Sequence, residues 1–562
     1  MSSMENWMRS HSKPSTGSHR FATLEIVNEA GRKSASFLGE NPDRISDNHR
    51  SRMRVVQIDT NSKAAATNTD ESDYDIDPQD QPLSKAWKAS WPLYFDQIHI
   101  SEDLADLHIT IGKGTSDAGP DRGVDILVIC PGKPPMGVIK NHAIIRLHPE
   151  SGFPMIGGVN DKHPVDLQML DGGYEEFGAG RWHILCQFVN RFTIGELQCT
   201  LTYSAPTQKK LDGMRRVRDE IFKRNGFEAP DARLPVLPFD EALRHVGPTF
   251  VFDYIASGAF GLIGIGVDEY TGKVWAVKSI PIKKESTREE IVREVKVSLQ
   301  LSGEAGILET YNATCSGGHI VYPEDYVYLW SDFGTCAIPE EIHLTSKLGK
   351  GDFRSIKVDE LDFQDVIGIF AGVLEGLDNL HSRVYMHRDV TVRNMLVMSW
   401  NPPRGVLCDF GKTILGRTYT SCHAGPVATR APEMDGIRAY TNAVDVWSCG
   451  YAFALVLIPD MARTTCHKND DRQSEDWVKN ISERLTALGD QSLLHRQVTN
   501  LVKEMLAFQP EDRPTALSLL LRWPLRQLVV LDDGGPPRKF QKDSESRKMP
   551  VKLDCRLLWR SP

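Results

Sequence analysis

The chain has 562 residues, of which 40% are hydrophobic and 25% are charged, and its net charge is −9. This length exceeds a single hydrophobic core, so we expect two or more domains. Acidic and basic residues are mixed, which gives no indication of general nucleic-acid binding, and no apolar run is long enough to cross a bilayer. The ten cysteines contain no CxxC pair. They are typical of reduced thiols, so we expect an intracellular protein, cytoplasmic or nuclear, with no nucleic-acid or membrane partner.

The N-terminal region, residues 1–88, is polar and poor in large apolar side chains. Its run NTDESDYDIDPQDQP, at 68–82, is acidic. Such a composition cannot bury enough apolar surface to offset the entropy lost on ordering. The sequence therefore predicts a disordered N-terminal tail over 1–88.

Short β-branched runs separated by Gly, Pro and Asp fill residues 91–206, for example LHITIG at 107–112 and WHILCQFV at 182–189. Several short strands with turn residues between them predict an all-β sandwich. Residues 207–249 follow as a basic helix over 207–225, ended by Gly226, and a Pro-rich linker.

From residue 250 strand-like runs come first, and helical patterns dominate after about residue 287. That order predicts an α+β domain of two lobes over 250–525. Residues 526–562 are basic and polar, and they read as a C-terminal tail.

A glycine-containing run at 255–263 lies between two strand-like segments. Glycine lets the backbone approach a triphosphate and point its N–H groups at the oxygens. Seventeen residues after Gly261, Lys278 lies inside an apolar strand. A buried lysine needs an anionic partner, and nucleotide phosphates would supply it. The candidate nucleotide-binding residues are Gly258, Ala259, Phe260, Gly261, Ala276 and Lys278.

A carboxylate partner for Lys278 is expected in the helical stretch at 287–301. Glu294 is our candidate, because Val292, Val295 and Val297 surround it in the sequence. Glu289 and Glu290, in the same stretch, are expected to be solvated.

The run YMHRDVTVRNML at 385–396 carries the strongest signal. Asp389 is suited to accept the proton of a substrate hydroxyl, and Asn394 follows five residues later. Asp409, twenty residues after Asp389, opens an Asp-Phe-Gly triplet. An amide and a carboxylate at this spacing are suited to Mg²⁺ beside nucleotide phosphates. Further on we expect a Glu433–Arg513 ion pair and an Asp445 that holds the catalytic-loop backbone.

With these motifs in order, residues 250–525 resemble a eukaryotic protein kinase. The resemblance implies a bilobal kinase fold that uses ATP and Mg²⁺, preceded here by the β-sandwich and the disordered tail. It also implies a role for each site residue: Asp389 is the base, Lys278 pairs with Glu294 and the phosphates, Asn394 and Asp409 bind metal, Gly258 and Gly261 cover the phosphates, and Arg388 contacts a phosphate on the activation loop. Phosphorylation within 418–421 is therefore expected to raise activity.

Two positions leave the hydroxyl specificity open. Thr391 occupies the place where serine/threonine kinases usually carry lysine, and Arg393 is typical of tyrosine kinases. We expect a protein serine/threonine kinase that acts on protein substrates in a signalling pathway. A tyrosine-directed kinase and an ATP-binding pseudokinase scaffold are the alternatives.

Residues 107–203 resemble a forkhead-associated (FHA) domain, on Ile111-Gly112-Lys113, on the run at 140–145 and on the run at 191–195. The resemblance implies binding of a phosphothreonine-containing protein, with Lys113 and Lys140 where the family carries arginine. A sandwich used for docking or autoinhibition is the alternative. The pairing of the two domains resembles that of fungal FHA-containing kinases.

Overall fold

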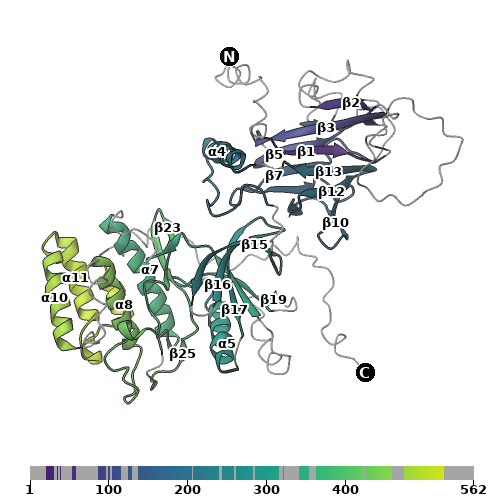
Figure 1. Cartoon of the computed structure of the whole chain (residues 1–562). Helices are drawn as coiled ribbons and strands as arrows, with labels where there is room; N and C mark the ends of the chain where they lie inside the picture. Colours follow the sequence, from purple (N-terminus) through teal and green to yellow (C-terminus); the bar gives the residue numbers. More distant parts are fainter. Residues whose placement is uncertain are drawn as a thin grey trace, which may run out of the picture. The chain divides into compact units, whose positions relative to one another are not determined.

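The computed structural model describes residues 20–28, 30, 34–35, 38, 53–58, 86–95, 99–101, 104–114, 124–128, 137–204, 207–238, 244–258, 261–282, 285–315, 320–321, 341–353, 362–421, 424–458 and 474–524. The chain divides into two compact units (Figure 1). The first unit runs up to Asp253 and takes in Val267–Val274, and the second comprises Tyr254–Gly266 and continues from Trp275.

Two β-sheets build most of the first unit. The first sheet has the order β10-β9-β12-β13-β1-β3-β2, with bounds β1 Arg20–Ile26, β2 Arg54–Ile58, β3 Ala86–Tyr94, β9 Val165–Gln168, β10 Tyr174–Phe177, β12 Val189–Ile194 and β13 Leu197–Tyr203. The second has the order β11-β8-β7-β5-β4, with β6 parallel to β5, and its bounds are β4 His99–Ser101, β5 Leu104–Gly112, β6 Ile126–Leu127, β7 Ala143–Leu147, β8 Pro154–Gly158 and β11 Trp182–Ile184. Buried side chains from both sheets share one hydrophobic core.

Strand β1 corrects the prediction of a disordered tail over 1–88. It pairs antiparallel with β13 on one side and with β3 on the other. Ala22 and Leu24 are fully buried, Ile26 is nearly so, and the ring of Phe21 stacks on Phe95 at 4.6 Å. Three alternating apolar residues suffice to anchor a strand when both neighbours are present. The polar composition averaged over the whole region concealed this short pattern.

Helix α4, Gln208–Arg224, confirms the predicted basic helix. Its last turn closes at Gly226, which has a φ of 81°, and the N–H of Phe227 donates to the carbonyl of Phe222 at 2.9 Å. That positive φ is why glycine stands there. One basic residue of this helix is not solvated, because Arg218 is fully buried and donates to Asp219 at 3.0 Å.

A third sheet opens the kinase-like part, with the order β14-β15-β16-β17-β20-β18-β19. Its strands are β14 Arg244–Val246, β15 Thr249–Gly258, β16 Gly261–Asp268, β17 Val274–Pro281, β18 Thr310–Cys315, β19 Ile320–Val321 and β20 Glu341–Lys347. Helix α5, Glu285–Gln300, packs on β17, β18 and β20 through a small apolar cluster that includes Ile291, Val295 and Leu344.

The helical part follows, with α7 Phe363–Ser382, α8 Ala443–Leu457, α10 Glu475–Gly489, α11 Leu493–Met505 and α12 Ala516–Arg522. Two small sheets accompany the helices, one of β21 Gly351–Asp352, β23 Met395–Trp400 and β24 Pro403–Leu407, the other of β22 Tyr385–Met386 and β25 Ile414–Leu415. Helices α7 and α8 form the centre, where Phe370 stacks on Phe453 at 3.5 Å. The order of a β-rich part and then an α-rich part confirms the α+β class predicted for this region.

Almost every residue of helix α8 is buried in the same core. Its apolar character therefore serves packing, as expected for this stretch. In the part of the chain that the structure describes, no helix has the length and apolarity needed to span a membrane.

Leu24→Ala tests the position of strand β1. We expect it to lower the free energy of unfolding by about 2–4 kcal/mol, because it removes a fully buried side chain from a strand with neighbours on both sides. The measurement is urea unfolding of the full chain followed by circular dichroism. Val27→Ala, one residue beyond the strand and 46% exposed, is the control and should change the unfolding curve little. If both variants had the same free energy of unfolding, the placement of β1 within the sheet would be wrong.

Candidate active site

The predicted phosphate loop joins strands β15 and β16. Gly258 ends β15 and Gly261 begins β16, whereas Ala259 and Phe260 lie outside the described residues. A Cβ atom at Gly261 would overlap the carbonyl oxygen of Ser279 on β17. Glycine is therefore required at this position for the close approach of two strands, independently of any phosphate.

Lys278 on β17 lies between two carboxylates. Its Nζ is 2.5 Å from Oε1 of Glu294 on α5 and 3.2 Å from Oδ1 of Asp409. Burial lowers the pKa of Lys278, but the negative charges of Glu294 and Asp409 outweigh it and hold that pKa above its usual value. Burial raises the pKa of Glu294, against the opposing charge of Lys278. Ala276 precedes Lys278 by two residues on the same strand, so both project from one face of the sheet.

Asp445 fixes the backbone of the catalytic loop, as the sequence predicted. This fully buried carboxylate accepts the N–H of His387 at 2.8 Å and the N–H of Arg388 at 2.7 Å. Nε2 of His381 on α7 lies 3.0 Å from the same side chain. Arg388 has a φ of 66°, a conformation that costs a non-glycine residue about 1–3 kcal/mol. The bonds to Asp445 stabilise it.

Asp389, the predicted base, has one bonded and one unbonded carboxylate oxygen. Nδ2 of Asn394 donates to Oδ2 of Asp389 at 3.3 Å and to its main-chain oxygen at 2.8 Å. The other oxygen, Oδ1, is buried and has no hydrogen-bond partner among the described residues. Burial and the nearby charge of Asp409 raise the pKa of Asp389 to about 7. An unbonded oxygen with a pKa near neutrality is suited to proton transfer.

Asp409 and Asn394 offer a carboxylate and an amide oxygen beside this base. The amide nitrogen of Asn394 donates to Asp389, so the amide oxygen is the atom of this side chain that could contact a metal ion. Within the described residues, no group of three or more His, Cys, Asp or Glu side chains could hold a metal ion. Mg²⁺ typically binds through one or two protein oxygens together with substrate phosphates, so this donor set fits Mg²⁺ with a nucleotide.

The expected ion pair between Glu433 and Arg513 is present. The guanidinium makes two bonds to the carboxylate, at 2.5 and 2.9 Å, and both side chains are buried. Arg513 also donates to the main-chain oxygen of Ala507 at 2.8 Å. The pair thus fixes the segment at 431–433 to the end of α11.

The expectation of a solvated Glu290 was wrong. Nζ of Lys412 lies 2.7 and 2.8 Å from the two carboxylate oxygens of Glu290. A signal was present in the sequence, since Glu290 lies four residues before Glu294 and therefore on the same face of α5. Nothing in the sequence indicated that Lys412 was its partner.

The Arg388 side chain contacts residues that follow the Asp-Phe-Gly triplet. Its Nε donates to the main-chain oxygen of Lys412 at 3.0 Å, and its guanidinium lies 4.7 Å from the centre of the Tyr419 ring. Of the segment expected to be phosphorylated, Thr418, Tyr419 and Thr420 are exposed. In this arrangement Arg388 holds the backbone at Lys412 and the ring of Tyr419 in place.

In the first unit, Lys113 and Lys140 lie on neighbouring turns. The N–H of Lys113 donates to the oxygen of Ile139 at 3.2 Å, and the N–H of Gly114 donates to the oxygen of Lys140 at 3.0 Å. His142 is a satisfied core histidine, because its Nδ1 accepts the N–H of Ile139 and its Nε2 lies 3.2 Å from the oxygen of Pro164.

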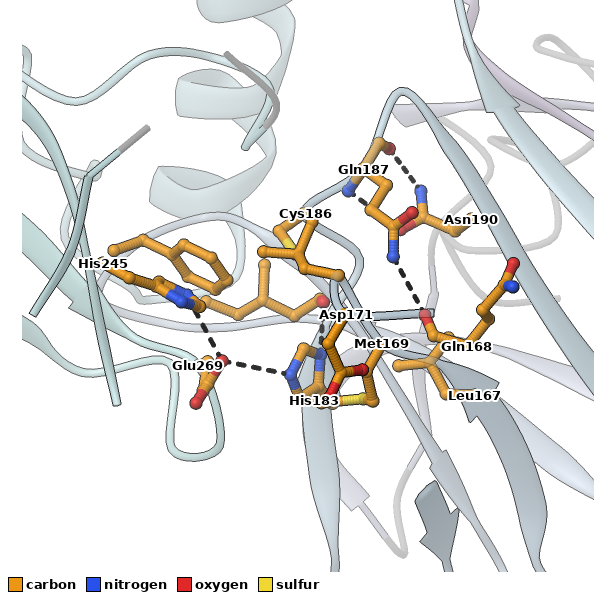
Figure 2. A pocket seen from close by; sticks show the side chains of 13 residues that line it. Leu167, Gln168, Met169, Asp171, His183, Cys186, Gln187, Asn190, His245 and Glu269 are labelled. Atoms are coloured by element: carbon orange, nitrogen blue, oxygen red, sulfur yellow. Dashed lines mark hydrogen bonds and ion pairs between the residues drawn. The ribbon is translucent and has the colours of Figure 1, made fainter. Parts of the chain in front are cut away.

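The first unit also contains a hollow of about 220 Å³, shown in Figure 2. Nε2 of His183 and Nε2 of His245 both lie 3.5 Å from Oε2 of Glu269 at one side of it. Gln187, which donates to the oxygen of Gln168 at 2.9 Å, lies at another. None of the predicted site residues lines this hollow, and we assign no chemistry to it.

The raised pKa of Asp389 predicts a pH-dependent stability. The folded pKa, about 7, exceeds the ordinary value of 3.8, so the folded state binds the extra proton and loses stability as the pH rises from about 4 to 7. Without nucleotide or metal, Asp389→Asn should therefore raise the free energy of unfolding by about 2 kcal/mol at pH 8 and change it little at pH 4.

Urea unfolding in EDTA at the two pH values checks this. Asp435→Asn is a control of opposite sign, because backbone bonds from Arg438 and Ile437 lower the pKa of Asp435 to about 2. That variant should be less stable than the wild type at pH 8. An Asp389→Asn variant that gained nothing at pH 8 would contradict the burial of this carboxylate.

Comparison with known proteins agrees with this geometry. Residues 251–523 match the family model described as "Protein kinase domain". Calcium-dependent protein kinase 27 of Arabidopsis thaliana is 28% identical over 279 residues, which cover 47% of this chain and 52% of that protein. Mitogen-activated protein kinase 10 of Oryza sativa subsp. japonica is 26% identical over 346 residues, covering 54% and 53%.

Mitogen-activated protein kinase kinase kinase 1 of Mus musculus is 28% identical over 280 residues, which cover 47% of this chain and 17% of that protein. The chain spans about half the length of the two plant relatives. The residues that match the family model include Lys278, Asp389 and Asp409. Residues 251–523 are therefore a protein kinase domain.

Proposed function

We propose that this chain is an ATP-dependent protein kinase that phosphorylates serine or threonine side chains of protein substrates. One observation carries the proposal: the unbonded, buried Oδ1 of Asp389 lies in a site where Lys278, Glu294 and Asp409 converge. A structural carboxylate would have both oxygens satisfied. A base needs one oxygen available for the substrate proton.

In this mechanism the Asp389 carboxylate accepts the proton of the substrate hydroxyl at Oδ1 and orients the hydroxyl oxygen toward the γ-phosphate. A bond forms between that oxygen and the γ-phosphorus, while the bond from the γ-phosphorus to the β,γ-bridging oxygen breaks, and ADP leaves. Lys278, held by Glu294, binds the nucleotide phosphates. The backbone at Gly258, where β15 ends, and at Gly261, where β16 begins, would cover the nucleotide phosphates.

Asp409 and Asn394 would hold Mg²⁺, which when bound neutralises charge on the phosphates. Arg388 acts as a positioning residue in this proposal, because its contacts are to the activation segment. We prefer serine and threonine because residues 107–203 resemble an FHA domain, and kinases that carry an FHA domain are directed at serine and threonine. The positions that left the question open, Thr391 and Arg393, are buried and exposed respectively.

Phosphotransfer by the full chain tests the proposal. Wild type and Asp389→Asn are incubated with labelled ATP, Mg²⁺ and a generic protein substrate, and the phosphorylated amino acids are identified. We expect phosphoserine or phosphothreonine from the wild type and a rate at least about 100-fold lower from the variant, which lacks the base.

Three outcomes would contradict this function. Phosphotyrosine alone would establish the tyrosine-directed alternative. Bound ATP without phosphotransfer, with the activation segment both phosphorylated and dephosphorylated, would establish the scaffold alternative. Equal rates from wild type and Asp389→Asn would show that Asp389 is not the base.

We also propose that the first unit binds a phosphothreonine-containing protein. The supporting observation is that backbone bonds bring the turns of Lys113 and Lys140 side by side at one end of the sheets. A Cβ at Gly112 would overlap the main-chain oxygen of Lys140, so the close approach of the two turns depends on glycine. Two lysines on adjoining turns attract a phosphate as point charges.

The binding test uses the full chain and fluorescent peptides that carry phosphothreonine or threonine at the same position. We expect binding of the phosphorylated peptides only, and a loss of about tenfold or more in Lys113→Ala/Lys140→Ala, which removes both charges. Lys209→Ala/Lys210→Ala, on the exposed face of α4, is the charge-matched control. Equal losses of peptide affinity in both variants would show that net charge, and not a site at Lys113 and Lys140, attracts the peptide. If no peptide bound, docking or autoinhibition would remain as the role of this unit.

A further inference from the structure

Helix α5 carries two carboxylates one turn apart, and each holds a lysine from a different element. Glu294 binds Lys278 of the sheet, and Glu290 binds Lys412, which directly follows the Asp-Phe-Gly triplet. Residues four apart lie on one face of a helix, so a single face of α5 makes both ion pairs. The first pair belongs to the proposed chemistry, whereas the second is not required by it.

Lys412 is joined to the catalytic loop as well as to α5. Its main-chain oxygen accepts Nε of Arg388 at 3.0 Å, while its Nζ binds both oxygens of Glu290 at 2.7 and 2.8 Å. The N–H of Arg388 is in turn held by Asp445. A continuous set of bonds thus links α5 to the start of the activation segment and to the loop that carries the base.

The remaining contacts of Arg388 are with uncharged groups. The guanidinium lies over the ring of Tyr419, and its Nη1 lies 3.5 Å from the hydroxyl of Tyr440. Tyr419 is fixed in place, because it exchanges two backbone hydrogen bonds with Tyr440, at 3.0 and 2.9 Å. Arg388 is therefore engaged by Tyr419, Tyr440 and the main-chain oxygen of Lys412.

We propose that Glu290 and Lys412 are positioning residues that hold α5, and with it Glu294, in the catalytic arrangement without a phosphate on the activation segment. The inference rests on the proposed kinase activity and concerns its regulation. It departs from the expectation that phosphorylation within 418–421 raises activity. The segment is already tied to α5 by one ion pair and to Arg388 by neutral contacts.

The exposure of the pair sets the size of its effect. The side chain of Lys412 is 18% exposed and that of Glu290 is 31% exposed. A pair that is partly buried and makes two bonds is screened less than an exposed surface pair. Lys412 also acts electrostatically on Asp389, so a change at Glu290 isolates the ion pair better than a change at Lys412.

The test measures kcat and the KM for ATP of full-length protein that has been dephosphorylated and verified by mass spectrometry. Glu290→Gln should lower kcat measurably and by up to about fivefold, which is the shift in the ratio of arrangements expected for loss of a partly buried ion pair. Glu504→Gln is the matched control, because it breaks the 2.6 Å pair with Arg522 on exposed side chains of α11 and α12. The control should leave kcat unchanged.

Rescue distinguishes positioning from a general loss of stability. Glu290→Asp keeps a carboxylate opposite Lys412 and leaves the charge near Asp389 unchanged, so it should retain more of the wild-type kcat than Glu290→Gln does. Circular dichroism melting of Glu290→Gln and Glu504→Gln should agree with the wild type, so that a fall in kcat does not arise from unfolding.

Each contrary result separates this inference from the proposed function. Wild-type activity after dephosphorylation with an unaffected Glu290→Gln overturns the role of the pair and leaves the kinase activity intact. Wild-type activity only after phosphorylation of the segment overturns independence from phosphate. Absence of phosphotransfer in both forms, with ATP bound, overturns the proposed function itself.

Discussion

A lysine amine between two carboxylates organises the kinase domain of this protein. Nζ of Lys278 contacts Glu294 and Asp409, so a strand, a helix and the segment after β24 meet at one buried cation. Moving such a cation from water into the protein is costly unless it is paired, and removing one partner typically costs about 3–5 kcal/mol. The relative placement of these three elements is therefore set by charge as well as by the shape of the core.

The same part of the domain contains the backbone strain of the catalytic loop and its neighbours. Val384, Arg388 and Asp409 all have φ values near 65° although none is glycine. The buried carboxylate of Asp445 compensates for part of this strain by accepting two consecutive N–H groups of the loop. These bonds keep the backbone at Arg388, directly before Asp389, from relaxing to an unstrained conformation.

The sequence predicted the parts of the site whose chemistry demands a fixed residue type at a fixed spacing. Lys278 was recognisable because a charge inside an apolar strand needs a partner, and Asp389, Asn394 and Asp409 were recognisable because they stand at the spacings of the protein-kinase motifs. Glu433 with Arg513 and Asp445 with the loop could be named because they stand in the further motifs that complete this series. These predictions depend on chemistry that a single side chain must perform.

What escaped prediction depends on contacts between distant segments. Glu290 and Lys412 are 122 residues apart, and each resembles an ordinary surface charge when read alone. Strand β1 has only seven residues and lies in a polar region, so its short alternating apolar pattern is a weak signal when the sequence is read alone. The strand is stabilised by pairing with β3 and β13, and these contacts form only when the chain folds.

The two ion pairs on one face of α5 determine how strongly kcat responds when one of them is weakened. Glu290 and Glu294 lie on the same face of α5, so both ion pairs oppose a movement of that face away from Lys412 and Lys278. Weakening one pair by about 1 kcal/mol shifts the ratio of the two arrangements about fivefold, but kcat falls by that whole factor only if the alternative arrangement already predominates, and by less where the catalytic arrangement does. The sensitivity of kcat to Glu290 therefore reports how close α5 stands to leaving its site. Phosphorylation of the activation segment can add activity only where that balance is not already complete.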